Sequence, residues 1–283
     1  MKPEQTRLNA SIEDAHWWFA ARRHILREVV HDLIPPSKDA LVIDIGCGTG
    51  GNTGALADEY RCVGIDALPE AIEFASKLRP AARFICGQVP RDLGPLAREA
   101  KLFLMMDVIE HVPDDFAWFS SIAAEASPGA LFLLTVPADP DLWSKHDEAG
   151  LHYRRYELER FQRVWEGLPF TTLMLTHYNT RLYRLVKFVR AMNMMLGRTS
   201  GDAGTDMRVP SKPVNDTLYS LFASESKVLR RALAEKRPSA FKHGVSMMAV
   251  LRREPGEIRL RTKPANVAAD PFDPVAMRLT GVK

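Results

Sequence analysis

The stretch "LVIDIGCGTGG", residues 41–51, sets four apolar residues around a single acid, Asp44, directly before a cluster of glycines. A short apolar run that ends in glycines is typical of a buried strand turning tightly into a helix. Few ligands suit a turn that offers both bare backbone and a carboxylate. The identity of that ligand therefore decides both the fold and the function.

The glycine spacing alone fits two templates. Gly46, Gly48 and Gly51 match the dinucleotide pattern GxGxxG, whereas Gly46, Gly48 and Gly50 match a shorter GxGxG. A lone match of either kind is a weak signal, because both use glycine to bring backbone close to a ligand. Asp66 ends the next predicted strand and suits ribose hydroxyls in either case.

Asp44 separates the two templates. A dinucleotide would bring a pyrophosphate to this turn, and a carboxylate two residues before the first glycine would repel it. S-adenosylmethionine instead carries an ammonium group, a ribose, an adenine and a positive sulfonium. The turn thus favours S-adenosylmethionine over a nicotinamide dinucleotide.

Apolar runs alternate with helical patterns along the first half of the 283-residue chain. This alternation predicts an α/β fold with a doubly wound parallel sheet. The predicted strands are 41–45, 62–65, 83–86, 102–106 and 131–136, and the predicted helices between them are 53–59, 69–78, 93–99 and 114–126.

The remaining patterns divide the chain into parts. We expect an N-terminal helical cap over 1–38, with Ser11 as its capping residue, and a core over 39–178 and 244–254, with two further strands at 170–178 and 244–254. A helical insertion over 179–243 holds predicted helices at 181–196 and 216–236, joined by a polar loop. The proline-containing tail, 255–283, is expected to be extended or disordered.

Composition restricts the class of protein. The net charge of +3 gives no reason to expect nucleic acid as a partner. The three cysteines form no CxxC pair, which favours reduced thiols. The polar start is unlike a secretory signal, and no apolar run approaches the ~18 residues of a membrane span. We therefore expect a cytoplasmic protein, whose oligomeric state the sequence leaves open.

Three segments together resemble a known family. "DIGCGTG" (44–50) resembles motif I of the class I S-adenosylmethionine-dependent methyltransferases, and "CVGIDALPEAIEFA" (62–75) resembles their second-strand acid and the helix that follows. "LFLMMDVIEHVPDD" (102–115) is similar to the fourth-strand segment of the subgroup with the ubiquinone and menaquinone methyltransferases. The resemblance implies a Rossmann-like, seven-stranded sheet with its last strand antiparallel.

The resemblance also implies a set of cofactor contacts. The glycine turn would line the methionyl end of S-adenosylmethionine, and Asp66 would bind the ribose. Where the family often has an aspartate for the adenine, this sequence has Gln88 and Val89 after the third strand. The implied cofactor-binding residues are Asp44, Gly46, Cys47, Gly48, Gly50, Asp66, Ala67, Gln88, Val89, Met106, Asp107 and Val108.

The methyl acceptor is expected at the carboxyl edge of the sheet, after the fifth strand. "LWSKHDEAGLHYRRYE" (142–157) gathers aromatic and titratable side chains there. The candidate bases are His111, His146 and His152, since a neutral histidine can accept a hydroxyl proton. We expect no metal, because the histidines show no ligand spacing on one element. Acceptor contacts are predicted for Trp143, Asp147, Arg155, Tyr156 and Tyr178.

The segment "HWWFAARRHIL" (16–26) is a second aromatic and basic cluster. As part of a lid over the cofactor, it would let Trp17 contact the acceptor, and Arg22 or Arg23 meet a carboxylate or phosphate. Alternatively, the aromatic residues dock the helix on the sheet.

Residues 181–196 form a basic amphipathic pattern. Such a helix either lies on an anionic membrane surface, covers a lipophilic substrate, or is part of the buried core with one solvent-exposed edge.

The favoured function is methyl transfer by in-line displacement from S-adenosylmethionine to oxygen or nitrogen of a small molecule, with lipophilic and glycosylated molecules among the candidates. The alternatives are a non-catalytic S-adenosylmethionine-binding protein that acts through its insertion, and a nicotinamide dehydrogenase.

Overall fold

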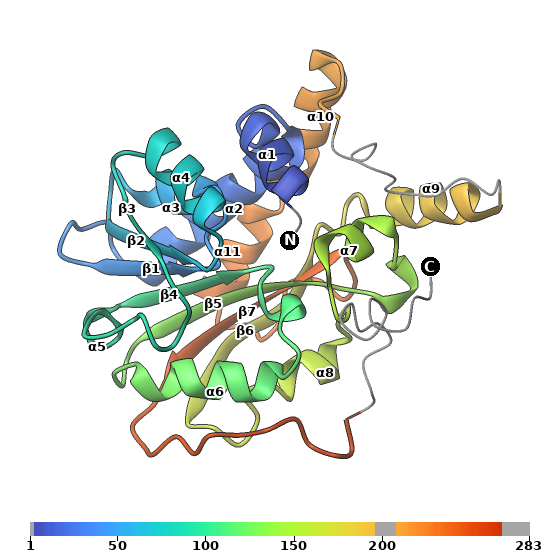
Figure 1. Ribbon diagram of the computed structural model, residues 1–283. Coiled ribbons are helices and arrows are strands. Elements are labelled where there is room, and N and C mark those ends of the chain that lie inside the picture. Colours follow the sequence, from blue (N-terminus) through green and yellow to red (C-terminus); the bar gives the residue numbers. More distant parts are fainter. Residues whose placement is uncertain (1–2, 196–207, 268–283) are drawn as a thin grey trace, which may run out of the picture.

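A computed structural model describes residues 3–195 and 208–267 (Figure 1). Its centre is a seven-stranded sheet with the order β3-β2-β1-β4-β5-β7-β6. The first five strands are parallel, and β7 runs antiparallel to both β5 and β6. The predicted fold class is confirmed. The strands are β1 (Leu41–Ile45), β2 (Arg61–Asp66), β3 (Arg83–Cys86), β4 (Leu102–Met106), β5 (Leu131–Pro137), β6 (Phe170–Tyr178) and β7 (Ser246–Arg253).

The strand order reverses direction at β1. This strand pairs with β2 on one side and with β4 on the other. The chain therefore builds the sheet outward from β1 through β2 and β3, and then continues on the other side of β1 with β4. All five residues of β1 and all five of β4 are buried, because helices cover both faces of the sheet. Ligands of doubly wound folds bind at the carboxyl ends of strands that flank such a switch point. The topology thus brings the glycine turn and the end of β4 side by side.

One face of the sheet is covered by N-terminal and insertion helices (Figure 1). The apolar residues of the long N-terminal helix recur at helical spacing, and Ala21, Ile25 and Val29 are fully buried. The last two insertion helices pack against that helix. The helices on this side are α2 (Trp17–Leu33), α3 (Gly51–Leu56), α4 (Pro69–Leu78), α10 (Lys212–Ala223) and α11 (Ser226–Ala234).

The other face is covered by shorter elements. Phe119 on the long helix of this side packs against Phe132 of β5. The described tail, 255–267, runs as an extended segment beneath that helix (Figure 1), where Lys263 donates its backbone N–H to Asp114 Oδ2 at 3.0 Å. Besides α5 (Leu96–Glu99), α6 (Asp115–Glu125) and α8 (Leu158–Gln162), the connections after β4 and β5 hold η1 (Ile109–His111), η2 (Pro140–Leu142) and α7 (Lys145–Gly150).

The N-terminal prediction of one helix capped by Ser11 is wrong. The chain forms two helices there, α1 (Pro3–Ile12) and α2. Ser11 lies in the last turn of α1 and donates to Leu8 O, so it caps nothing. His16 caps α2 instead, because its Nδ1 accepts the N–H of Trp18 at 3.2 Å.

The insertion also differs from the prediction of one helix over 216–236. The structure divides this segment into α10 and α11, with Glu225 between them. Glu225 is buried, and its Oε1 accepts the backbone N–H groups of Thr180 and Arg181 at 2.8 Å each. A tertiary contact therefore sets the break. It also fixes the entry to α9 (Tyr183–Met195), which projects from the body (Figure 1).

Within the described ranges, no helix has the length and apolar character to span a membrane. Parts of three predicted segments lie outside the described residues. These are the end of the predicted helix at residue 196, most of the predicted polar loop (197–207) and the last part of the tail (268–283).

Candidate functional site

The glycine turn between β1 and α3 uses left-handed backbone at Gly46, Gly48 and Gly50, with φ of +68°, +53° and +80°. A Cβ on Gly46 would lie 2.7 Å from Val108, and one on Gly50 would lie 2.8 Å from the Phe84 ring. Those two glycines are therefore also required by packing. A Cβ on Gly48 would meet nothing within 4 Å, so this glycine borders open space that a ligand could fill.

Asp44 lies beneath this turn and is almost fully buried. Thr53 donates its hydroxyl hydrogen to Asp44 Oδ2 at 2.6 Å. Burial, together with the nearby charge of Asp66, raises the pKa of Asp44 to about 7. A cation beside the carboxylate would favour its charged form, which agrees with the predicted preference for an ammonium group.

Asp66 organises the turn from the end of β2. Its Oδ2 accepts the N–H of Gly48 and its Oδ1 accepts the N–H of Leu68, each at 2.9 Å. The sequence predicted only a ribose contact and missed this positioning role. Ala67 follows β2 and Gln88 follows β3, and both side chains are exposed. Val89 instead packs partly against the core. Cys47 is buried, and burial raises the pKa of its thiol, so the thiol stays neutral.

The end of β4 is tied to α2 by a buried ion pair. Asp107 has left-handed backbone with φ of +57°. Its Oδ1 accepts the Thr135 hydroxyl at 3.0 Å, and its Oδ2 lies 2.5 Å from Arg22. Burial opposes the charge of Arg22, but Asp107 and other nearby acidic groups raise its pKa above the ordinary value. Arg22, predicted to contact the acceptor, thus has an internal partner and also stacks on Trp18 at 4.3 Å.

The segment between α1 and α2 contacts the glycine turn through a residue that the sequence analysis missed. Glu13 is buried, and its Oε2 accepts the Thr49 hydroxyl at 2.7 Å. Its Oε1 accepts from Arg79 at 3.0 Å. A Cβ on Gly51 would lie only 2.7 Å from Glu13 Oε2. The segment that precedes the predicted lid therefore packs directly on the turn.

Asp147 organises the loop after β5. This fully buried carboxylate accepts the Ser144 N–H at 2.9 Å, the Arg155 Nε–H at 2.9 Å and a hydrogen bond with His152 Nδ1 at 3.1 Å. Burial by itself would raise the pKa of Asp147, but Arg155 and His152 hold it well below its usual value. Arg155 also donates to Ala138 O at 2.8 Å, which fixes the loop to the end of β5.

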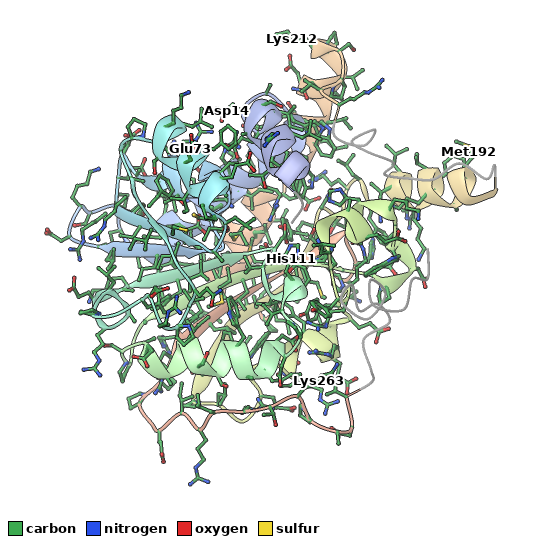
Figure 2. All side chains as sticks on the ribbon, viewed as in Figure 1. Asp14, Glu73, His111, Met192, Lys212 and Lys263 are labelled. Atoms are coloured by element: carbon green, nitrogen blue, oxygen red, sulfur yellow. The ribbon has the colours of Figure 1, made fainter. Side chains whose placement is uncertain are left out.

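The three predicted histidines gather at this edge. The rings of His111 and His152 lie 4.6 Å apart, and those of His146 and His152 lie 6.4 Å apart. Burial lowers the pKa of both His111 and His146. Figure 2 shows His111 in the middle of the molecule, on η1. Neutral imidazoles in this position can accept a proton.

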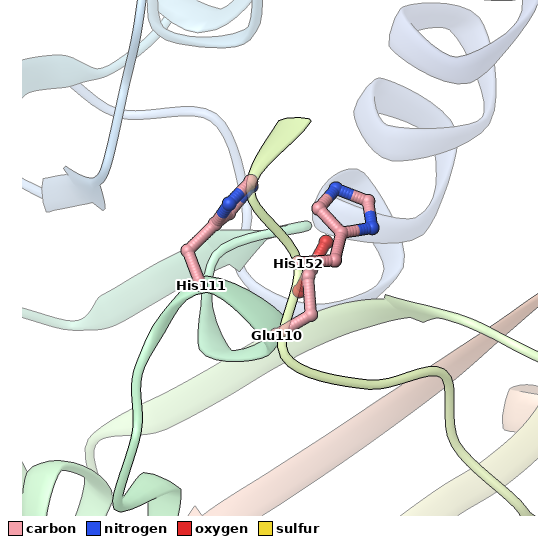
Figure 3. Close-up of side chains that lie close together, drawn as sticks. All are labelled: Glu110, His111 and His152. Carbon is pink, nitrogen blue, oxygen red and sulfur yellow. The ribbon is translucent and has the colours of Figure 1, made fainter. Parts of the chain in front are cut away.

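Glu110 is a second residue that the sequence analysis missed. Its side chain is fully buried, and neither carboxylate oxygen accepts a hydrogen bond from another described residue. Burial, with a contribution from Asp107, raises the pKa of Glu110 well above its ordinary value. Glu110, His111 and His152 each offer an atom within 4.8 Å of the others (Figure 3). The available signal was the glutamate–histidine pair directly after the fourth strand.

Several residues predicted to contact the acceptor have partners within the protein. Tyr156 is fully buried and donates to Asp115 Oδ2 at 2.8 Å. Tyr178 is buried and stacks on Phe222 at 5.9 Å. The ring of Trp17 also contacts Phe222, which is the docking alternative stated for the aromatic cluster. Trp143 is half-buried, and the half-buried Arg23 lies 3.6 Å from Asp14.

A family model described as "Methyltransferase domain" matches residues 18–185. "Probable tocopherol O-methyltransferase, chloroplastic" from Oryza sativa subsp. japonica is 30% identical over 105 residues, which are 34% of this chain and 29% of that protein. Ajmaline N-methyltransferase from Rauvolfia serpentina is 30% identical over 116 residues, 38% of this chain and 40% of that protein. The chain thus spans less than half the length of the curated relatives it matches.

A solved structure has the same fold. It is the plantazolicin methyltransferase BpumL in complex with a monoazolic desmethylPZN analogue and S-adenosylhomocysteine, with a TM-score of 0.51 and 12% identity over 89% of each chain. At this identity the likeness concerns the fold alone.

Proposed function

Because this chain belongs to the class I S-adenosylmethionine-dependent methyltransferases, we propose that it transfers a methyl group from that cofactor to oxygen or nitrogen of a small molecule. The observation that carries the proposal is the glycine turn with open space at Gly48, next to the carboxyl groups of Asp44 and Asp66. A turn of this kind can accept a cationic amino-acid group together with a ribose.

The residues present fit S-adenosylmethionine. Asp44 offers a buried carboxylate for the ammonium group, and Asp66 offers lone pairs for the ribose hydroxyls while it holds Gly48 N–H. The cofactor supplies an electrophilic methyl group on a sulfonium. The protein has to bind it, align the acceptor and exclude water. Met106 and Val108 at the end of β4 flank the turn and would restrict the space next to the sulfonium.

The acceptor would lie between the glycine turn and the loop that follows β5. A hydroxyl acceptor loses a proton as its oxygen bonds to the methyl carbon, and the neutral His146, or His111 where no metal is bound, can accept it. An amine that is already deprotonated needs no base. The similar proteins include both an O- and an N-methyltransferase, so either acceptor class is consistent with the family.

The helix α9 supports a lipophilic acceptor or contact with a lipid surface. Leu185 and Phe188 are 54% and 63% exposed, and Met192 lies far from the body of the molecule (Figure 2). The helix contains no acid, and its charged side chains are all basic. An exposed apolar stripe with basic residues is typical of a helix at an anionic membrane surface.

Binding of S-adenosylhomocysteine, measured by isothermal titration calorimetry, tests the cofactor site. Gly48→Ala should weaken binding at least tenfold, because the added methyl group occupies the open space beside the turn. Gly129→Ala is the matched control. Gly129 also has left-handed backbone and no atom within 4 Å of an added Cβ, but it precedes β5 at the opposite edge of the sheet. Equal affinities for the two variants would contradict the placement of the cofactor.

Turnover separates the enzyme from the non-catalytic alternative. Release of S-adenosylhomocysteine should appear when the protein is supplied with small-molecule extracts and the cofactor. Tight cofactor binding without release across chemically diverse extracts would instead support a binding protein. A nicotinamide dehydrogenase would bind NAD with an affinity that Asp44→Asn leaves unchanged.

A further inference from the structure

Glu110 is a buried carboxyl group that forms no ion pair with any described residue. Of its acidic neighbours, Asp107 is paired with Arg22 and Asp147 is paired with Arg155. Glu110 itself has no ion pair among the described residues, and its carboxyl group is fully buried. A buried carboxyl group without a hydrogen-bond partner requires either a proton or a cation.

Two side chains close to Glu110, those of His111 and His152, carry ring nitrogens of the type that binds metals. His111 Nδ1 is buried and has no hydrogen-bond partner within the described part of the chain. The Nδ1 of His152 forms a hydrogen bond with Asp147 Oδ1 at 3.1 Å, so Nε2 is the ring nitrogen that could bind a metal. A carboxylate that orients one nitrogen of a histidine so that the other can bind a metal is a recurrent arrangement in metal sites.

The Asp147 carboxylate that orients His152 is itself held in place by other residues. It accepts from Ser144 and from Arg155, both at 2.9 Å, so its position does not depend on His152. The supporting carboxylate therefore stays ionised and oriented. One possible ligand atom from each of Glu110, His111 and His152 lies within 4.8 Å of the other two (Figure 3).

We propose that Glu110, His111 and His152 bind one divalent transition-metal cation of the Zn²⁺ type. Two imidazoles and one carboxylate suit such ions, whereas Mg²⁺ and Ca²⁺ prefer all-oxygen sites. With metal–ligand bonds of about 2 Å, tetrahedral ligands lie roughly 3.3 Å apart. The side chains thus close by up to about 1.5 Å around the ion, a change that rotamer adjustment can supply. Three protein ligands leave a coordination position open.

The site lies next to the cofactor turn. Val108 packs against Gly46, and Glu110 and His111 follow on the same short segment. Resting on the proposed function, the open position would bind the acceptor oxygen. The metal lowers the pKa of that hydroxyl, its proton passes to water, and the oxygen forms a bond to the methyl carbon while the carbon–sulfur electron pair stays on sulfur.

The sequence predicts no metal site, because its histidines show no ligand spacing on one element. The ligands instead come from η1 and from the loop after α7, which the fold of the chain brings together. Tyr153 fixes this approach, because its backbone N–H donates to Glu110 O at 2.8 Å.

The experiment uses the full chain, stripped with a chelator and titrated with Zn²⁺ in a calorimeter and with Co²⁺ in a spectrophotometer. The background is Cys86→Ser, because Cys86 is an exposed free thiol that could bind zinc. We expect one equivalent of either metal, with Co²⁺ giving the visible absorption of a low-coordinate site. Glu110→Gln and His152→Ala should each weaken Zn²⁺ binding at least tenfold.

His146→Ala is the matched control. Its ring lies 6.4 Å from that of His152 but outside the ligand group, so Zn²⁺ affinity should be retained. No Zn²⁺ binding by the parent chain, or unchanged binding by Glu110→Gln, would overturn the proposal. The Glu110 carboxyl group would then carry a proton in place of a metal ion. S-adenosylhomocysteine affinity, measured separately without metal, reports on the proposed function, so the two failures are distinguishable.

Discussion

The contact between Arg22 and Asp107 should be one of the main anchors of the N-terminal helices. Arg22 is buried, lies 2.5 Å from Asp107 Oδ2, and donates to Thr135 Oγ1 at 3.1 Å. Arg22→Met retains most of the apolar stem but removes the charge. The perturbation therefore leaves the Asp107 carboxylate and the Thr135 hydroxyl without their common partner.

The size of the effect follows from the burial of the two groups. Removing one member of a buried ion pair costs about 3–5 kcal/mol, because a charge is left uncompensated. The Asp107 side chain is 21% exposed, so water would solvate part of it. Loss of the stacking on Trp18 adds about 1 kcal/mol. We expect the free energy of unfolding to fall by about 3–5 kcal/mol in total.

Urea unfolding followed by circular dichroism measures this loss, and Arg27→Met is its control. Arg27 lies on the same helix and pairs with Glu59, but its side chain is 51% exposed. An exposed pair contributes about 0–1 kcal/mol. A double variant, Arg22→Met with Asp107→Asn, should recover part of the loss because it removes the stranded charge. Equal losses for Arg22→Met and Arg27→Met would refute the assignment of a buried anchor.

Three further outcomes are expected. Because the pKa of Asp44 is about 7 when folded against an ordinary 3.8, its contribution to stability is present at pH 4 and lost by pH 8. Asp44→Asn should therefore gain up to about 4 kcal/mol over the native chain between those pH values in urea unfolding, and a constant difference would contradict the burial argument. Asp66→Ala should weaken S-adenosylhomocysteine binding by about 1–3 kcal/mol in calorimetry, since it leaves Gly48 N–H unpaired, and an unchanged dissociation constant would remove Asp66 from the site. Phe188→Glu should reduce co-sedimentation with phosphatidylglycerol vesicles, whereas Lys212→Glu on α10 should leave it nearly unchanged. Equal behaviour of those two variants would contradict a lipid role for α9.

The sheet could be predicted because each of its strands carries its own signal. Residues 41–45 and 102–106 are buried on both faces, and short apolar runs such as these, interrupted only by Asp44, are typical of buried strands in an α/β chain. The glycine turn was equally local. Gly46, Gly48 and Gly50 all have left-handed backbone, which glycine adopts without strain.

Predictions that depended on a distant partner were less complete. The break between α10 and α11 depends on Glu225, whose carboxylate accepts N–H groups from Thr180 and Arg181 more than forty residues away. The sequence pattern around Glu225 continues as a helix on both sides. The ion pair of Arg22 was equally hard to predict, because its partner Asp107 lies on a distant segment. A sequence alone offers many acidic residues as partners for one arginine.

The sequence by itself determined the sheet, the glycine turn and the choice of a cationic nucleoside cofactor, because these depend on residues within a few positions of one another. Only the tertiary structure decided that Glu110, His111 and His152 meet, that Glu13 packs on the glycine turn, and that Asp66 holds the turn. The physical reason is burial. Whether a carboxyl group is solvated, paired or left alone depends on which segments fold over it, and no local pattern of residues contains that information.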